Sequence, residues 1–341
     1  MPDRSAGCGG DRARQPGGSW RWKTGTGIAS LRGMARSPRY VPPHSTVEVT
    51  IKTIDDRFLL RPSKELNDVI LGILGKALTK YPVLLHAFVV MSNHMQSLLT
   101  TPNGRVLAAF MNYVNSKIAR EAGRIYNWRA RLFARRYRHI VVLDDDAVVD
   151  RLRYIMSHGA KEGLVWDPEH WPGANSLPWL VHGETLRGTW YDRSAMSRIR
   201  ARGMRIDPRR FATIYEVPLA PIPCWRELPA EEYHRRCRGL LDEVREHLAQ
   251  VFRREGMQPI GAKAVKRQDP LGRPRSPKRG PAPSCHSTSR SARQQYLRQL
   301  AEFVGAYRAA SARFRAGELD VVFPSHSFPP PRSFVLLEAG P

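Results

Sequence analysis

The chain has 341 residues, of which 42% are hydrophobic, so it can bury a large core in two domains, or in one domain with a substantial appendage. Its 55 Lys and Arg residues against 31 Asp and Glu residues give a formal net charge of +24, which indicates a nucleic-acid partner rather than a membrane. No apolar stretch approaches the roughly 18 residues that span a bilayer, and the N-terminus lacks an apolar signal core, so neither a membrane protein nor a secreted protein is expected.

The four cysteines include no CxxC pair, so the sequence predicts neither a zinc ribbon nor a disulfide framework. A reduced cytoplasmic protein is expected, and the positive charge adds an association with the nucleoid. Two His–Cys pairs could supply four zinc ligands, but their spacing is not that of a zinc finger. These ligands would be His234, Cys237, Cys285 and His286.

Residues 1–35 are rich in Gly, Arg and Ser and show no apolar periodicity, which predicts a disordered basic tail. Compact sequence begins shortly after Met34. We therefore interpret Met34 as a candidate for the true translation start. N-terminal sequencing of the native protein checks this interpretation, and a native product that retains Trp20 and Trp22 would contradict it.

The first elements have clear periodicities. Alternation of apolar and polar residues over 46–53 predicts a half-buried strand. Ser63 is a suitable N-cap for a helix that runs to about Lys80, with an apolar stripe along one side. Residues 83–91 and 94–99 then predict two neighbouring strands, separated by a turn.

The next predicted elements are a helix, a strand and a second helix. A helix is expected near 105–122, and a strand over 139–143 follows a basic, aromatic loop. Residues 144–146 are acidic and predict the N-terminus of a helix that runs to about Lys161. This order fits an α+β, ferredoxin-like sandwich, an antiparallel sheet with helices on one face.

The expected domain of residues 36–175 is followed by a helical, Pro-rich accessory region over 176–341. Residues 165–228 are rich in Pro and Trp and show no clear periodicity. Amphipathic helices are expected near 229–256 and 290–316, with a basic, Pro-rich connector between them. The pattern does not indicate what this region does.

Two candidate sets of reactive side chains stand out. On the predicted strand, His94 and Gln96 share one face because side chains alternate, and Met95 points to the other. On the predicted third helix, four residues form a stripe apart from the core face, which would present a phenol, an imidazole and two cations together. The stripe consists of Arg151, Tyr154, His158 and Lys161. The alternative is a half-buried tyrosine on a solvated basic face.

The loop over 128–138 interleaves five arginines with three aromatic residues. Guanidinium groups bind phosphate, while aromatic faces can stack on unpaired bases, so this loop is a candidate nucleic-acid surface. Its arginines are Arg129, Arg131, Arg135, Arg136 and Arg138. The alternative is that Phe133 and Tyr137 belong to the core and that the arginines are simply solvated.

Four blocks of the sequence resemble the REP-associated tyrosine transposases, of the insertion-sequence-200-like group of HUH single-strand nucleases. They run from His86 to His94, over 110–115, over 132–137, and from Leu152 through Val165. The resemblance covers roughly residues 36–170. It implies a ferredoxin-like nuclease domain that cleaves single-stranded DNA, near a hairpin or palindrome, with one tyrosine and a divalent cation, Mg²⁺ or Mn²⁺.

By position, the resemblance implies that Tyr154 is the nucleophile and that His94 and Gln96 stand where the two HUH histidines lie. His158 occupies a position where relatives often place a polar residue near the metal. Attack by the tyrosine would leave a 5′-phosphotyrosine and a free 3′-hydroxyl, and needs no nucleotide cofactor. Arg151 and Lys161 join the loop arginines as expected DNA contacts.

Gln96 departs from the family pattern. A glutamine offers a neutral carbonyl oxygen, which Mg²⁺ accepts but binds weakly. One alternative is therefore a catalytically degenerate or domesticated protein that binds nucleic acid without cutting it. Another alternative is an RNA-binding or RNA-processing protein, which would prefer RNA over DNA of the same sequence.

Overall fold

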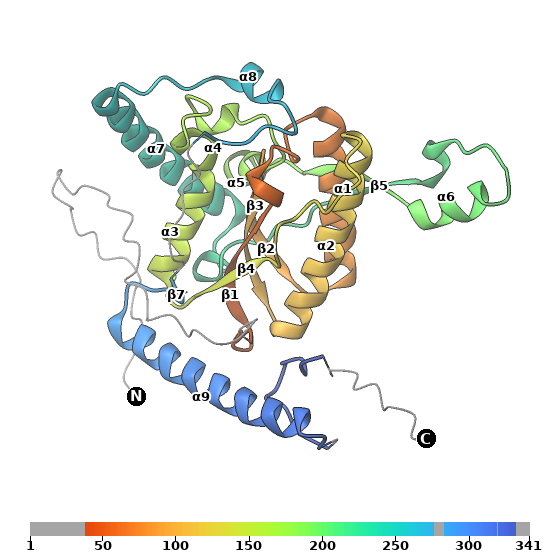
Figure 1. The fold of residues 1–341 in the computed structure, drawn as a ribbon. Helices are drawn as coiled ribbons and strands as arrows, with labels where there is room; N and C mark the ends of the chain where they lie inside the picture. Colours follow the sequence, from red (N-terminus) through yellow and green to blue (C-terminus); the bar gives the residue numbers. More distant parts are fainter. Residues whose placement is uncertain (1–37, 276–282, 319, 332–341) are drawn as a thin grey trace.

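Figure 1 shows the computed structural model of the chain, which describes residues 38–275, 283–318 and 320–331. The expected basic tail over 1–35 and the candidate start at Met34 lie outside these residues. The described part contains a five-stranded sheet, a separate two-stranded ribbon, and helices on both faces of the sheet.

The main sheet has the strand order β2-β3-β1-β4-β7. Its strands are β1 (Ser45–Lys52), β2 (Leu84–Met91), β3 (His94–Thr101), β4 (Arg138–Val142) and β7 (Cys285–His286). The first four pair antiparallel, with β1 between β3 and β4, and the short β7 joins β4 in parallel. With one helix after β1 and another after β3, this order is the ferredoxin-like arrangement, so the expected α+β class is confirmed.

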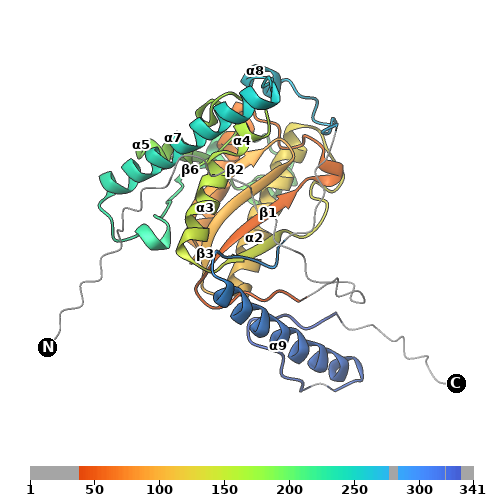
Figure 2. The same cartoon turned by 90° about the vertical axis from the view of Figure 1, so that its left-hand side faces the viewer.

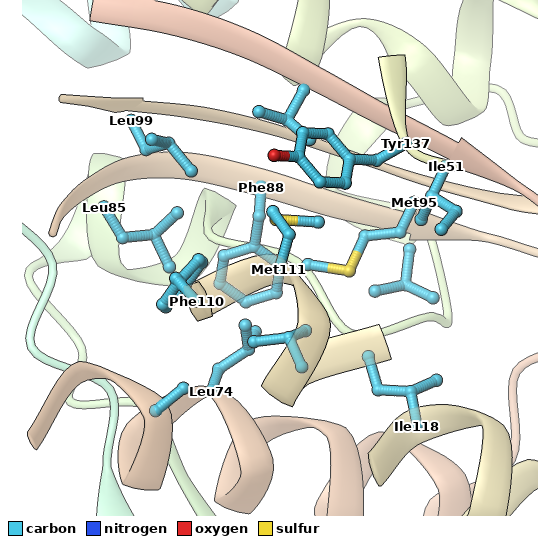
Figure 3. Close-up of a cluster of buried hydrophobic side chains, with 14 of the residues drawn as sticks. Ile51, Leu74, Leu85, Phe88, Met95, Leu99, Phe110, Met111, Ile118 and Tyr137 are labelled. Carbon is cyan, nitrogen blue, oxygen red and sulfur yellow. The ribbon is translucent and has the colours of Figure 1, made fainter. Parts of the chain in front are cut away.

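One face of the sheet is covered by α1 (Lys64–Lys80) and α2 (Gly104–Ile125). The Ser63 hydroxyl accepts a hydrogen bond from the backbone N–H of Leu66 at 3.1 Å and so begins α1 where the sequence predicts it. Figure 3 shows the core that the two helices share with the sheet. Phe88 and Met95 both point into this core, because strand alternation turns them away from the opposite face, and Phe88 lies beside Phe110.

The other face carries a second helical layer, beyond the single layer expected from the sequence. It consists of α3 (Asp145–Met156), α4 (His158–Lys161), α5 (Leu177–His182) and α7 (Ala230–Glu255). Figure 2 shows α3 lying across the strands, with α7 beside it. Ala87, Val89 and Leu98 of the sheet pack against Leu152 of α3 and its neighbours. Burial of seven of the eight residues of β2 fits a strand that is covered on both faces.

Helices expected beyond residue 176 are present as α7 and α9 (Arg290–Arg315), with the short α8 (Ala262–Lys266) between them. Because α5 and α7 contribute to the second core, residues after 176 help to cover the sheet. The boundary at residue 175 stays a prediction. Helix α9 lies beyond one end of the strands (Figures 1 and 2). Among the described residues, no helix is both long and apolar enough to cross a membrane.

Within residues 165–228, where no element was expected, β5 (Arg187–Tyr191) and β6 (Ala212–Glu216) form an antiparallel ribbon that lies on α1. Between them stands α6 (Arg193–Arg200). The ribbon approaches the backbone of α1 so closely that a β-carbon on Gly72 would lie 2.2 Å from the carbonyl carbon of Thr189. A glycine at this position is therefore required by packing, not by backbone angles.

We expect Gly72→Ala to lower the free energy of unfolding by about 1–3 kcal/mol, because the added methyl group forces the ribbon away from α1. Urea unfolding followed by circular dichroism measures this change. Gly239→Ala is the matched control, since nothing lies within 4 Å of its added methyl group on α7. That variant should be more stable by up to about 1 kcal/mol, because alanine favours a helix. Equal effects of the two substitutions would contradict the close approach.

His86 on β2 makes stability depend on pH. It is 1% exposed, and its ring nitrogens lie 3.0 Å from the carbonyl oxygen of Ala220 and 2.8 Å from the hydroxyl of Thr100. Burial lowers its pKa from 6.5 to about 4. The folded state therefore keeps the ring neutral while the unfolded chain binds a proton, so stability falls as the pH drops from 6.5 to about 4.

The contribution of His86 is up to about 3 kcal/mol over that range. His86→Gln should reduce the slope of unfolding free energy against pH by about 1.4 kcal/mol per unit, the value for one proton. Urea unfolding at a series of pH values between 4 and 6.5 checks this. Parallel curves for the two proteins would show that His86 does not titrate on unfolding.

Candidate active site

The inner strand β3 presents His94 and Gln96 on the face that α3 covers, opposite Met95, which lies in the core under α1 and α2. His94 is the first residue of the strand, directly after the turn at Ser92 and Asn93, and so stands at one end of the strands. Gln96 lies deeper and is 3% exposed. The two side chains therefore share a face, as alternation predicts, but have different surroundings.

The imidazoles of His94 and His158 face each other. Their Nε2 atoms are 2.7 Å apart, and their rings cross at 67°. The Nδ1 atom of His94 lies 2.8 Å from the side-chain oxygen of Asn93, which can only accept, so this nitrogen carries the proton. The Nε2 atom of His94 then has a lone pair directed at His158.

The pKa of His94 is lowered to about 4, chiefly by burial; the positive charges of Lys52 and Lys161 act in the same direction, and the carboxylates of Glu162 and Asp56 oppose them. The ring is therefore neutral at neutral pH, which is the state that can bind a metal ion. Nε2 of His158 therefore donates the hydrogen bond to Nε2 of His94, and His158 would have to carry its proton on Nδ1 for both Nε2 atoms to bind a cation. This pair joins two elements 64 residues apart in the sequence.

Tyr154 lies next to this pair on α3. Its ring centroid is 5.3 Å from that of His158, and the ammonium of Lys161 lies 3.3 Å above its ring. The guanidinium of Arg151 is 4.9 Å from the same ring centroid. The stripe expected from helical spacing is therefore assembled, although α3 ends at Met156 and the last two members stand on the separate α4.

The pKa of Tyr154 is raised to about 12, chiefly by burial and to a smaller extent by the carboxylates of Glu48 and Glu162. Arg151 acts in the opposite direction. A phenol with such a pKa is almost entirely protonated at neutral pH and is a poor nucleophile unless a further positive charge or a base assists it. In this structure the hydroxyl of Tyr154 is therefore protonated and not yet activated as a nucleophile.

Gln96 is turned towards Glu48 of β1. Its side-chain nitrogen donates a hydrogen bond to a Glu48 carboxylate oxygen at 2.6 Å. The other oxygen of Glu48 lies 3.2 Å from Nε2 of His286 and 3.6 Å from Arg151. Although burial alone would raise the pKa of Glu48, these partners outweigh it and hold the pKa below its ordinary value, so Glu48 is a carboxylate.

Glu48 and His286 were not expected in the site from the sequence. In the sequence, Glu48 is one of the polar residues of an alternating strand, and His286 belongs to a segment more than 200 residues away. Only the pairing of β7 with β4 brings His286 to the sheet. A charged residue in the middle of a central strand was the one available signal, because such a residue needs a partner when it is buried.

The zinc site considered from the cysteines is not formed. His286 lies beside Glu48, whereas His234 bonds to the carbonyl of Leu180 on the other side of the second core. Among the residues that the structure describes, no group of three or more His, Cys, Asp or Glu side chains could hold a metal ion. A cation at His94 and His158 would therefore take its remaining ligands from Gln96, water or a bound phosphate.

These donors fit a divalent cation only in part. Imidazole ligands suit Mn²⁺ better than Mg²⁺, which prefers oxygen ligands. The orientation of His94, fixed by Asn93, supports the fit, because a hydrogen bond to the far nitrogen is the usual companion of a metal-binding histidine.

The basic loop lies at the same end of the sheet as His94. The backbone N–H of Ala134 donates to the carbonyl of Lys52, the residue that pairs with His94 across the sheet. Phe133 and Tyr137 are 8% and 7% exposed and belong to the core, so the expectation that they stack on bases is wrong. All five loop arginines are exposed: Arg129, Arg131, Arg135, Arg136 and Arg138.

Arg151 and Lys161, the two cations of the predicted stripe, are less exposed than the loop arginines and lie close to the ring of Tyr154. Arg151 is ion-paired with buried Glu48, and Lys161 lies 3.6 Å from Glu162 and above the ring of Tyr154. Both side chains are 15% exposed. They are therefore placed to act on the charge of the phenol, whereas the loop offers the more open surface for phosphate.

No family model and no curated protein matches the chain. Solved structures with similar folds include a REP-associated tyrosine transposase bound to a REP hairpin, at 17% identity and TM-score 0.36, which covers 51% of this chain and 89% of that one. A transposase from Deinococcus radiodurans R1 has 19% identity and TM-score 0.25 and covers 36% and 95%. The tRNA(His) guanylyltransferase of Saccharomyces cerevisiae has 9% identity and TM-score 0.32 and covers 57% and 97%. TM-scores this low say nothing of the chemistry of this chain.

Proposed function

We propose that this protein is a DNA transposase that cleaves single-stranded DNA and transfers the strand through Tyr154. The observation that carries the proposal is the meeting of Tyr154 with the facing His94–His158 pair, beside a loop of five exposed arginines. A tyrosine, a potential cation site and a phosphate-binding surface are the three parts that this reaction needs.

In the proposed reaction the phenolic oxygen of Tyr154 forms a bond to the scissile phosphorus, and the bond from phosphorus to the 3′-oxygen breaks. The phenol loses its proton and the 3′-oxygen gains one, so the products are a 5′-phosphotyrosine and a 3′-hydroxyl. The positive charges of Lys161 and Arg151 stabilise the phenolate as it forms. The same bond, attacked by another 3′-hydroxyl, would rejoin the strand without a nucleotide cofactor.

A divalent cation, Mn²⁺ or Mg²⁺, held by His94 and His158 would polarise the scissile phosphate and offset the negative charge that develops on it. The neutral state of His94 and its fixed Nδ1 proton suit this role. Gln96 could add its carbonyl oxygen, since its nitrogen is engaged by Glu48.

The proposal is tested by incubating the full chain with a hairpin oligonucleotide that has single-stranded flanks, in the presence of Mn²⁺ or Mg²⁺. A covalent protein–DNA adduct that resists denaturation, and that requires the cation, is the expected result. An absence of adduct with every flank and either cation would count against cleavage.

A second function, nucleic-acid binding without cleavage, is favoured by one observation. Among the described residues, no third His, Cys, Asp or Glu side chain completes a metal-binding group with the two histidines. This alternative predicts salt-sensitive binding of hairpins that does not depend on a divalent cation. The RNA-binding alternative predicts tighter binding to RNA than to DNA of the same sequence.

A further inference from the structure

A basic arm projects from the body of the molecule on the side opposite Tyr154. The arm, defined as residues 192–211, comprises α6 and the loop that follows it, carried on the β5–β6 ribbon. In Figure 1 it extends well beyond α1 and α2. Since the ribbon lies on α1 and Tyr154 lies on α3, the sheet separates the arm from the candidate active site.

The arm contains seven arginines and two aspartates. Both aspartates are used within the arm: Asp192 accepts a hydrogen bond from the N–H of Ala195, and Asp207 from the N–H of Arg209. Six arginines are exposed and form no ion pair within the part of the chain that the structure describes. They are Arg198, Arg200, Arg202, Arg205, Arg209 and Arg210.

The root of the arm is fixed to the body. The seventh arginine, Arg193, donates two hydrogen bonds, of 2.6 and 2.7 Å, to the buried carboxylate of Glu121 on α2. Although burial would raise the pKa of Glu121, the bonds from Arg193 and Arg124 hold it below its ordinary value. Met196 is the buried residue of α6. Arg198 and Arg200 are thus presented on a helix whose first residue is fixed to the body, which lowers the entropy lost when they bind.

The side chains of the arm favour one class of ligand. Single-stranded nucleic acid is bound by exposed aromatic rings together with cations. The aromatic residues at the root, Tyr191 and Phe211, are half-buried, and the Arg193 guanidinium covers the Tyr191 ring at 4.4 Å. A surface of arginines without exposed aromatic rings fits the phosphate backbone of a duplex. The duplex has a high density of negative charge, and its bases are stacked inside, where aromatic side chains cannot stack on them.

We propose that the arm binds the phosphate backbone of double-stranded DNA at a site separate from Tyr154. The choice of DNA rests on the proposed function, and a hairpin substrate would offer such a duplex as its stem. Because the arm is remote from the reacting groups, it contributes to affinity and not to the chemical step. A duplex bound there does not need sequence recognition, since phosphate contacts carry no sequence information.

The test compares the wild type with a variant that combines Arg198→Gln, Arg200→Gln, Arg202→Gln and Arg205→Gln. The matched control removes four exposed arginines that are each paired with a neighbouring glutamate, and so lowers the net charge equally. It combines Arg226→Gln, Arg235→Gln, Arg236→Gln and Arg254→Gln. All three full-length proteins are titrated with a blunt DNA duplex over a range of salt concentrations, and circular dichroism verifies their folding.

The arm variant should bind the duplex at least about tenfold more weakly near 0.1 M salt, and the slope of log K against log salt should fall by roughly one unit for each phosphate that the variant no longer neutralises. The control should stay close to the wild type. Equal losses of affinity in both variants, or none in the arm variant, would overturn the proposal. Tighter binding of an RNA duplex of the same sequence would overturn the choice of DNA.

Adduct formation is measured in parallel, on a hairpin with single-stranded flanks at saturating protein. The arm variant should form the adduct at the wild-type rate, since Tyr154 is untouched. A wild type that binds duplex through the arm but forms no adduct would contradict the proposed function while leaving the arm proposal intact. An arm variant that binds the duplex as tightly as the wild type and forms the adduct normally would contradict the arm proposal and leave the proposed function intact.

Discussion

Tyr154→Phe should abolish the covalent adduct with DNA while leaving DNA binding within about twofold of the wild type. The substitution removes the only atom that forms the bond to phosphorus in the proposed reaction, so the rate should fall by at least about 10³-fold, as when other enzymes are deprived of their nucleophile. The ring itself remains, and with it the contacts to Lys161 and His158. The measurement is denaturing electrophoresis of the adduct, with binding followed by fluorescence anisotropy.

Tyr113→Phe is the matched control for this prediction. Tyr113 stands on α2, where its ring packs against Tyr81, and burial raises the pKa of its phenol as it does for Tyr154. It belongs to the opposite face of the sheet, so its loss should leave the adduct unchanged. An adduct that survives Tyr154→Phe but disappears with Tyr113→Phe would move the nucleophile to α2.

The regular part of the fold could be predicted because its periodicities are strong and local. Ser63 begins α1, Asp144 begins α3, and the strand pattern of 46–53 is that of β1. The second helical layer could not be predicted in the same way. An amphipathic helix such as α7 shows that it has a buried face, but not which surface covers it.

The ribbon and the arm could not be predicted because their signals are weak. β5 and β6 are five residues each and lie half-exposed on α1, so neither shows a clean alternation. Their packing depends on glycines at Gly72 and Gly188, whose purpose appears only when the two backbones meet. The six arginines between residues 198 and 210 show in the sequence that this segment is positively charged, but not that it projects from the body of the molecule.

Four residues of the candidate site could be grouped from the sequence, but Glu48 and His286, which determine its electrostatics, could not. Helical spacing was enough to group Tyr154 with His158, and strand alternation was enough to group His94 with Gln96. The partner of Gln96 is Glu48, on a strand that pairs with β3 through a register that no local pattern reveals. The surroundings of Gln96 are therefore visible only in the folded chain.

Gln96→His should increase cation-dependent cleavage by roughly 10–100-fold, the range over which such metal-site contacts usually act. An imidazole at this position can donate one N–H to Glu48, which is a carboxylate and already accepts a hydrogen bond there. Its other nitrogen can then join His94 and His158 as a third donor. A carboxylate that orients a histidine in this way is a common feature of metal sites.

Affinity for Mn²⁺, measured by calorimetry in the absence of DNA, separates this effect from catalysis. Gln96→His should bind the ion more tightly than the wild type, whereas Gln96→Leu, which keeps much of the volume but offers no donor, should bind it more weakly. The double variant with Tyr154→Phe should gain affinity for Mn²⁺ without forming an adduct. If Gln96→His binds Mn²⁺ more tightly and still forms no adduct, the site holds a metal without cutting DNA, and the chain is better described as a nucleic-acid-binding protein.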